Sequence, residues 1–158
     1  MRIAIVLATL ILATPALAQF WTHYANARFG YELDIPPGYE GAGESVNGDG
    51  QAFHLPGGLQ ELTVWGGWLV EPENFEQEAA ARIAGDMEAG WALTDTATTP
   101  HWAGWSGVRG DRMMHQRMIA LCEGDGFAAL RADYPATDFV AMQPVLEGLA
   151  RSFAARGC

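Results

Sequence analysis

The 158-residue chain carries nine basic and nineteen acidic residues, which give a formal net charge of −10 at pH 7, and 49% of its residues are hydrophobic. This length and composition fit one folded globular domain and exclude a disordered or fibrous chain. The acidic balance argues against sequence-independent binding to nucleic acid or to an anionic lipid surface, because both need a basic face.

The first eighteen residues are predicted to be a cleaved signal peptide. Met1-Arg2 supplies a positive start, residues 3–12 are mainly apolar, and Ala16-Leu17-Ala18 has the small residues of a signal-peptidase site. The apolar run falls short of the roughly twenty residues that a membrane-spanning helix needs. We therefore expect a periplasmic or secreted protein with a single domain over residues 19–158 and no membrane contact after cleavage.

The first third of this domain has the pattern of short antiparallel strands. Residues 31–35 alternate apolar and acidic side chains and stop at a Pro-Pro-Gly turn. The cluster Asn47-Gly48-Asp49-Gly50 is typical of a hairpin turn. It is followed by predicted strands over residues 51–55 and 59–65, which are joined by a Pro-Gly-Gly turn at residues 56–58.

Residues 74–90 are predicted to form a helix. Asn74 is a favourable N-cap and Gly90 ends the pattern. Apolar residues recur every four positions, which places one apolar stripe along the helix: Phe75, Ala79, Ile83 and Met87. This stripe needs a sheet or another helix to cover it.

Four further strands are predicted, over residues 91–98, 102–109, 112–123 and 127–134. The third carries apolar side chains on both faces near its end. Met114, Met118 and Cys122 lie on one face, and Ile119 and Leu121 lie on the other. A strand buried on both sides indicates layers above and below the sheet.

A second helix is predicted over residues 137–155, with Thr137 or Asp138 as its cap. Its apolar stripe consists of Met142, Leu146, Leu149 and Phe153. Pro144 lies too deep for the first turn, so we expect a break there or a start near Met142. The order of elements predicts an α+β fold whose sheet is mainly antiparallel, with the helices outside it.

Several of these segments resemble the PsbP-like family. The segment over residues 28–39 is similar to the opening motif of that family. The residues that carry the similarity are Arg28-Phe29-Gly30-Tyr31, Leu33, Ile35, Pro36-Pro37 and Gly38-Tyr39. Together with Tyr134-Pro135 and the terminal Ala150-Arg151-Ser152-Phe153, this segment also resembles a group of exported bacterial proteins. The resemblance implies an antiparallel sheet with helices packed on both faces, a PsbP-like sandwich. It implies partner binding and no particular reaction, and it assigns no functional residue.

The chain has two cysteines, Cys122 and Cys158. Because an exported protein enters an oxidising compartment, we expect them to form a structural disulfide. The alternative reading, a reactive thiol or a metal-binding pair, lacks a Cys-x-x-Cys spacing and a nearby histidine.

Ser106, His115 and Asp111 contain the three residue types of a nucleophilic triad. No Gly-x-Ser-x-Gly elbow surrounds the serine. If residues 109–112 form a hairpin turn, however, Ser106 and His115 lie on neighbouring strands and can approach each other. An exported serine-type hydrolase that uses these two residues is the alternative function.

Four tryptophans occur in two pairs, Trp65 with Trp68 and Trp102 with Trp105. One interpretation is an aromatic surface for a peptide, glycan or hydrophobic partner; the other is that the rings fill a two-sided core. Residues three apart on a strand face opposite sides, so each pair forms one platform only if a glycine-supported bend intervenes.

No metal or cofactor is predicted. Asn47, Asp49 and Gln51 faintly resemble a calcium loop, but the twelfth position from Asn47 is Gly58 and not the required glutamate. The histidines have no metal-ligand spacing: His23, His54, His101 and His115. The leading interpretation is a non-catalytic exported binding or accessory module whose partner is an envelope protein or a small ligand. A structural envelope protein without a ligand is the third possibility.

Overall fold

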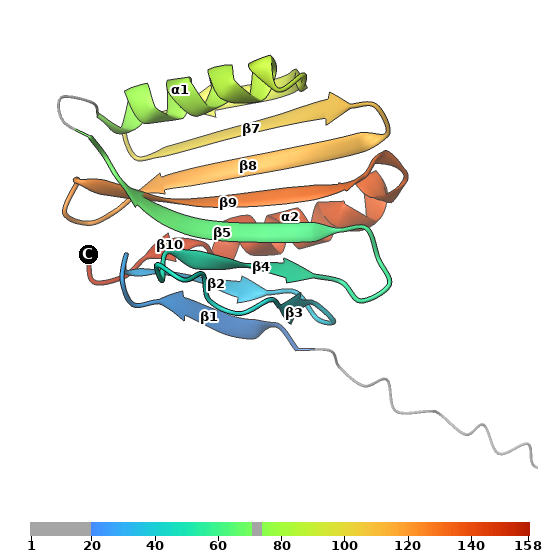
Figure 1. The fold of residues 1–158 in the computed structure, drawn as a ribbon, viewed down its shortest axis with the longest axis horizontal. Coiled ribbons are helices and arrows are strands. Elements are labelled where there is room, and N and C mark those ends of the chain that lie inside the picture. The colour runs from blue at the N-terminus through green and yellow to red at the C-terminus, as the bar shows by residue number, and fades with distance from the viewer. Residues whose placement is uncertain (1–19, 71–73) are drawn as a thin grey trace, which may run out of the picture.

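The computed structural model describes residues 20–70 and 74–158, so the predicted signal peptide, residues 1–18, lies wholly outside the described residues. The described residues fold into two helices and ten strands with one short 3-10 turn (Figure 1). The strands are β1 (Thr22–Asn26), β2 (Tyr31–Ile35), β3 (Glu40–Gly41), β4 (Gly50–His54), β5 (Glu61–Trp68), β6 (Ala92–Thr98), β7 (Trp102–Arg109), β8 (Arg112–Ala120), β9 (Gly126–Pro135) and β10 (Ala154–Ala155). The helices are α1 (Phe75–Glu88) and α2 (Phe139–Ser152), and the 3-10 turn η1 is Ala136–Asp138.

A seven-stranded antiparallel sheet forms the middle of the molecule. Its strand order is β3-β4-β5-β9-β8-β7-β6, with β8 and β9 near the centre. A smaller sheet has the order β1-β2-β10, so strands from near both ends of the described chain flank β2. Every strand pair in both sheets is antiparallel.

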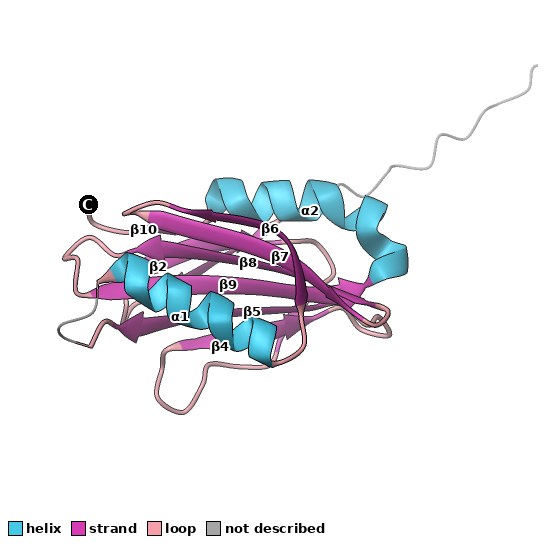
Figure 2. Cartoon of the chain, turned by 90° about the horizontal axis from the view of Figure 1, so that it is seen from above, coloured by secondary structure: helices cyan, strands magenta, loops and turns pink. Residues whose placement is uncertain are grey.

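The two helices cover opposite faces of the large sheet (Figure 2). Under α1 lies a core that includes Phe75, Ala79, Trp105 and Met118. On the other face, α2 and the small sheet share a second core, whose buried residues include Leu33, Val64, Leu130 and Leu149. This arrangement confirms the α+β prediction and the expected helices on both faces.

Strand β8 is buried on both sides, as predicted. Met114 and Met118 belong to the core under α1, whereas Ile119 and Leu121 belong to the core under α2. The predicted strand is longer than the real one: β8 ends at Ala120, and Cys122 follows in the turn before β9.

The helix predicted over residues 74–90 is α1. The Asn74 side chain accepts a hydrogen bond from the Gln77 backbone, and the Gln77 side chain accepts one from the Asn74 backbone, which forms a capping box. Gly90 follows the helix with φ +89°, a conformation that favours glycine. The apolar stripe is shorter than predicted, because Met87 is 60% exposed while Phe75 and Ala79 are buried.

The prediction of a break or late start at Pro144 is wrong. Helix α2 begins at Phe139 and includes Pro144, which lies on its exposed side. A proline costs a helix one backbone hydrogen bond and a steric adjustment, and the burial of Met142 and Leu149 on the opposite side offsets this cost. The helix ends at Ser152, earlier than predicted, and the chain continues as β10.

A disulfide joins Cys122 to Cys158, with Cα atoms 5.1 Å apart, as the sequence predicts. It ties the last described residue to the turn after β8. Nearby, the Arg156 backbone N–H donates to the Gly30 carbonyl at 2.7 Å, and β10 pairs with β2. The C-terminal segment is therefore held by backbone pairing and by a covalent link.

Within the described residues, neither helix has the length and apolar character needed to cross a membrane.

Candidate functional site: two grooves beside helix α2

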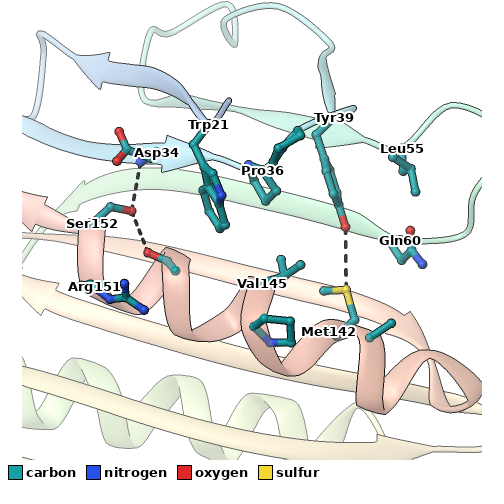
Figure 3. A pocket seen from close by; sticks show the side chains of 14 residues that line it. Trp21, Asp34, Pro36, Tyr39, Leu55, Gln60, Met142, Val145, Arg151 and Ser152 are labelled. Atoms are coloured by element: carbon teal, nitrogen blue, oxygen red, sulfur yellow. Dashed lines mark hydrogen bonds between the residues drawn. The ribbon is translucent and has the colours of Figure 1, made fainter. Parts of the chain in front are cut away.

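The larger hollow is a groove of about 860 Å³ between α2, the end of β2 and the β4–β5 connection (Figure 3). We call it the Tyr39 groove. Its walls are mainly apolar, and its principal side chains are Trp21, Pro36, Tyr39, Leu55, Met142 and Val145. Mainly apolar walls with a few polar groups are typical of binding sites.

Trp21 forms one end of the Tyr39 groove by lying on Gly148 of α2. A Cβ atom at position 148 would come within 3.1 Å of three atoms of the indole ring, so only glycine lets the ring approach this closely. Trp21 remains 37% exposed and is available to a ligand.

Tyr39 stands over the first turn of α2, where its hydroxyl donates to the Met142 sulfur at 3.8 Å (Figure 3). Burial, with a smaller contribution from Asp138, raises the pKa of Tyr39 to about 12. The phenol is thus neutral at physiological pH and presents an aromatic wall. Beside it, the Gln60 side-chain amide donates to Asp138 Oδ2 at 2.6 Å and connects the β4–β5 connection to the start of α2.

Ser152 fixes the other end of α2 against β2. Its hydroxyl accepts a hydrogen bond from the Asp34 backbone N–H at 3.0 Å and donates to the Gly148 carbonyl at 3.0 Å (Figure 3). Asp34 and Arg151 line this end as well. The apolar middle of the groove therefore lies between two polar ends.

Three exposed apolar residues lie next in the chain to residues that line the Tyr39 groove. Phe20, Leu59 and Val140 are each largely exposed, and each is the immediate chain neighbour of a lining residue. Exposed apolar groups concentrated around a hollow are typical of a surface that contacts another molecule.

The second hollow, of about 420 Å³, lies between α2 and the far side of the large sheet. We call it the His115 groove. Ser106 on β7 and His115 on β8 line it, and they are paired directly across the two strands. The Ser106 Oγ and His115 Nδ1 atoms share a hydrogen bond of 2.9 Å. The structure thus brings together the two residues of the hydrolase hypothesis.

The third expected member, Asp111, does not line the His115 groove; it lies in the exposed β7–β8 turn. The carboxylate nearest in register is Asp95, which pairs with Ser106 from β6. A β-bulge between Leu93 and Asp95 shifts the register, so Thr94 and Asp95 both line the groove. Strand alternation alone cannot reveal such a bulge.

His115 is neutral in this environment. Burial lowers its pKa, the positive charge of Arg117 lowers it further, and Asp95 opposes both effects. A neutral imidazole hydrogen-bonded to a serine hydroxyl can accept the serine proton or donate its own, depending on its tautomer. The pair can therefore act as a base and nucleophile or as a hydrogen-bond donor to a ligand.

The tryptophan pairs do not form platforms. Trp105 is 1% exposed under α1 and donates to Asp86 Oδ2 at 2.6 Å, and Trp65 lies on the same face with Arg82 above its ring. Trp68 is 51% exposed and packs against Phe29 on the opposite face. Each predicted pair is divided between the two faces of the sheet, because residues three apart on a strand alternate.

Trp102 belongs to the face of the large sheet that carries the His115 groove. It is 36% exposed, and the Arg117 guanidinium lies 5.0 Å from its ring centroid. Of the four tryptophans, Trp68 and Trp102 thus retain exposed surface, whereas Trp21, which no pattern in the sequence singled out, lines the larger groove.

The remaining motifs have local roles. Asn47 and Asp49 form a turn in which the Asn47 amide donates to Asp49 Oδ2 at 2.9 Å, as expected for a turn cluster. His23 contacts Asp34 at 3.1 Å on the surface. The described residues contain no group of three or more histidine, cysteine or acidic side chains placed to hold a metal ion.

No protein-family model and no curated protein matches the chain. Solved structures do match. CyanoP, the cyanobacterial PsbP of Synechocystis sp. PCC 6803, is 12% identical with a TM-score of 0.66, and the match covers 90% of this chain and 96% of CyanoP. This protein has a PsbP-like fold.

The yeast protein Mog1p shares the PsbP-like fold. Mog1p of Saccharomyces cerevisiae, described as a Ran-binding protein, is 13% identical with a TM-score of 0.60; the match covers 87% of this chain and 96% of Mog1p. A point mutant of Mog1 is 12% identical with the same TM-score, over 86% of this chain and 96% of that one. At such identities the likeness concerns the fold alone.

Proposed function

We propose that this PsbP-like protein is an exported, non-catalytic binding or accessory module that docks an extended apolar segment of a partner protein in the Tyr39 groove. The observation that carries the proposal is the groove itself, with its aromatic and proline walls and the exposed apolar residues that neighbour them in the chain. Export is supported by the tripartite N-terminal pattern and by the disulfide, which persists in oxidising compartments.

The shape and charge of the Tyr39 groove favour a chain segment over a compact ligand. Trp21 and Leu55 lie toward opposite ends of the groove, with Tyr39 between them and α2 running along its length (Figure 3). Aromatic-lined grooves bind extended proline-rich segments, whose conformation is largely preformed and therefore costs little to order. Since the chain has a net charge of −10, basic residues beside the apolar segment would strengthen encounter.

The proposal is tested by nuclear magnetic resonance titration with two synthetic decapeptides. One has a leucine- and proline-rich middle between lysines, and the other has glutamates in place of the lysines. We expect the lysine peptide to shift the backbone amide of Gly148 and the ring signals of Tyr39. The glutamate peptide should bind more weakly, because like charges repel.

Two matched variants locate the binding. Ala141 is exposed and lines the groove, so Ala141→Arg places a long side chain in it without disturbing the core. Met87→Arg places the same side chain on the exposed side of α1. Binding lost in the first variant and kept in the second supports the proposal. Binding unchanged in both, or no binding by either peptide, refutes it and favours a small ligand or a structural role.

The hydrolase remains the second candidate, favoured by the 2.9 Å hydrogen bond between Ser106 and His115. It is tested with an alkyl fluorophosphonate. If Ser106 is a nucleophile, its oxygen bonds to phosphorus, fluoride leaves with the bonding electron pair, and the serine proton passes to His115. Intact mass would then show one phosphonyl group on the wild type and none on Ser106→Ala. An unlabelled wild type removes this candidate.

A further inference from the structure

Arg117 differs from the other half-buried arginines in having no acidic partner among the residues the structure describes. Three arginines of similar burial each form an ion pair, Arg82 with Glu78, Arg112 with Asp133 and Arg131 with Asp86. Arg117 has no carboxylate within 4.0 Å in the described ranges, although acidic residues outnumber basic ones two to one in the chain.

The surroundings of Arg117 leave part of its hydrogen-bonding capacity unused. Its Nε atom is buried and has no partner in the described structure. Burial lowers the pKa of Arg117, though the guanidinium remains charged at physiological pH. The ring of Trp102 compensates part of the lost hydration through a cation–π contact. A half-buried cation without an anion is unfavourable, and a negatively charged ligand would relieve this cost.

A second hydrogen-bond donor lies in the same groove. His115 is two residues from Arg117 on β8, so both side chains project from the same face of the sheet, and both line the His115 groove. Whichever tautomer His115 adopts, its hydrogen bond to Ser106 leaves one donor free: the imidazole Nε2–H or the serine hydroxyl. A guanidinium and a neutral donor side by side match the two oxygens of a carboxylate.

The other lining residues restrict the class of anion. Met113 and Leu146 offer apolar contacts, which suit a hydrocarbon skeleton. Asp95 and Glu147 also line the groove and would repel a second negative group on the ligand. The groove, of about 420 Å³, has the size of a small-molecule site.

We propose that the His115 groove binds a small organic monocarboxylate, with Arg117 as its anchor and the Ser106–His115 pair as the second donor. This site is separate from the Tyr39 groove and does not depend on the function proposed for it.

The test compares three probes of similar size: hexanoate, its neutral amide hexanamide, and the dicarboxylate glutarate. Binding is followed by nuclear magnetic resonance through the side-chain Nε–Hε signal of Arg117 and the backbone amides of β7 and β8. We expect hexanoate to move these signals. Hexanamide should bind about tenfold more weakly or worse, because a charge-assisted hydrogen bond is lost, and glutarate should also bind more weakly than hexanoate.

Arg117→Gln is expected to weaken hexanoate binding by about tenfold or more. Arg151→Gln, which removes an exposed arginine of the Tyr39 groove, is the matched control and should leave binding unchanged. If Arg117→Gln does not fold, Arg117→Lys preserves the charge while removing the planar fork, and it should give intermediate binding.

Three results would overturn the proposal: no signal change with hexanoate up to its solubility limit, equal binding of hexanoate and hexanamide, or undiminished binding by the folded Arg117 variant. Ala141→Arg distinguishes the two grooves, because it should abolish binding of the lysine peptide and leave hexanoate binding intact.

Discussion

The disulfide permits a quantitative prediction. Cys122 and Cys158 are 36 positions apart, and closing a loop of that length removes chain entropy worth about 4 kcal/mol from the unfolded state. This figure is an upper value, because residual structure in the unfolded chain reduces it. We expect the reduced protein to lose about 2–4 kcal/mol of its free energy of unfolding.

Urea unfolding, followed by tryptophan fluorescence, measures this loss. The oxidised protein is compared with the protein in dithiothreitol and with the double variant Cys122→Ser/Cys158→Ser. The reduced protein and the double variant should agree, and dithiothreitol should leave the double variant unchanged. The urea dependence should become steeper when the link is absent, because the unfolded chain then expands. A loss below about 1 kcal/mol would refute the loop-entropy reasoning.

Three further predictions concern packing and titration. Gly66→Ala should destabilise the fold by about 1–3 kcal/mol in urea unfolding, because the new Cβ would overlap the Phe29 ring. Gly85→Ala, at a helical position with open space, should instead stabilise the fold by about 0.5–1 kcal/mol. Equal effects of the two substitutions on stability would contradict the packing described. The pKa of His115 is lowered in the folded state, so the unfolded chain takes up the proton first as the pH falls below about 6.5, and stability is lost there. Melting temperatures between about pH 7 and pH 5 should fall less steeply for His115→Gln; an unchanged slope would show that His115 does not contribute. For Tyr39, whose pKa is raised to about 12, the unfolded chain loses its proton first above about pH 10, so alkaline stability should decline less for Tyr39→Phe than for the wild type.

The sequence predicted the elements that carry clear periodicity. The alternation in residues 31–35, the Asn74 cap and the two apolar faces of β8 each reappear in the structure because local pattern and burial agree there. β1 and β10 were not predicted. Thr22–Asn26 has no regular alternation and Ala154–Ala155 is only two residues long, so both depend on pairing with β2, a contact between distant segments.

The two grooves depend on tertiary contacts and could be predicted only in part. A hairpin turn at residues 109–112 would let Ser106 and His115 approach each other, and in the structure they share a hydrogen bond. Asp95 lines the His115 groove because of the bulge in β6, and Trp21 lines the Tyr39 groove because it packs on Gly148 of α2. Neither contact leaves a local signal in the sequence, because the partners are brought together only by the completed fold.

The position of β2 between β1 and β10 bears on the order of assembly. Ala154 and Ala155 reach β2 only after almost the whole domain has been synthesised, although β1 and β2 are among its first segments. During synthesis one edge of β2 therefore stays unpaired until its partner strand, more than a hundred residues further along the chain, has been made. Until that strand arrives, the smaller sheet stays incomplete and β2 keeps an unpaired edge.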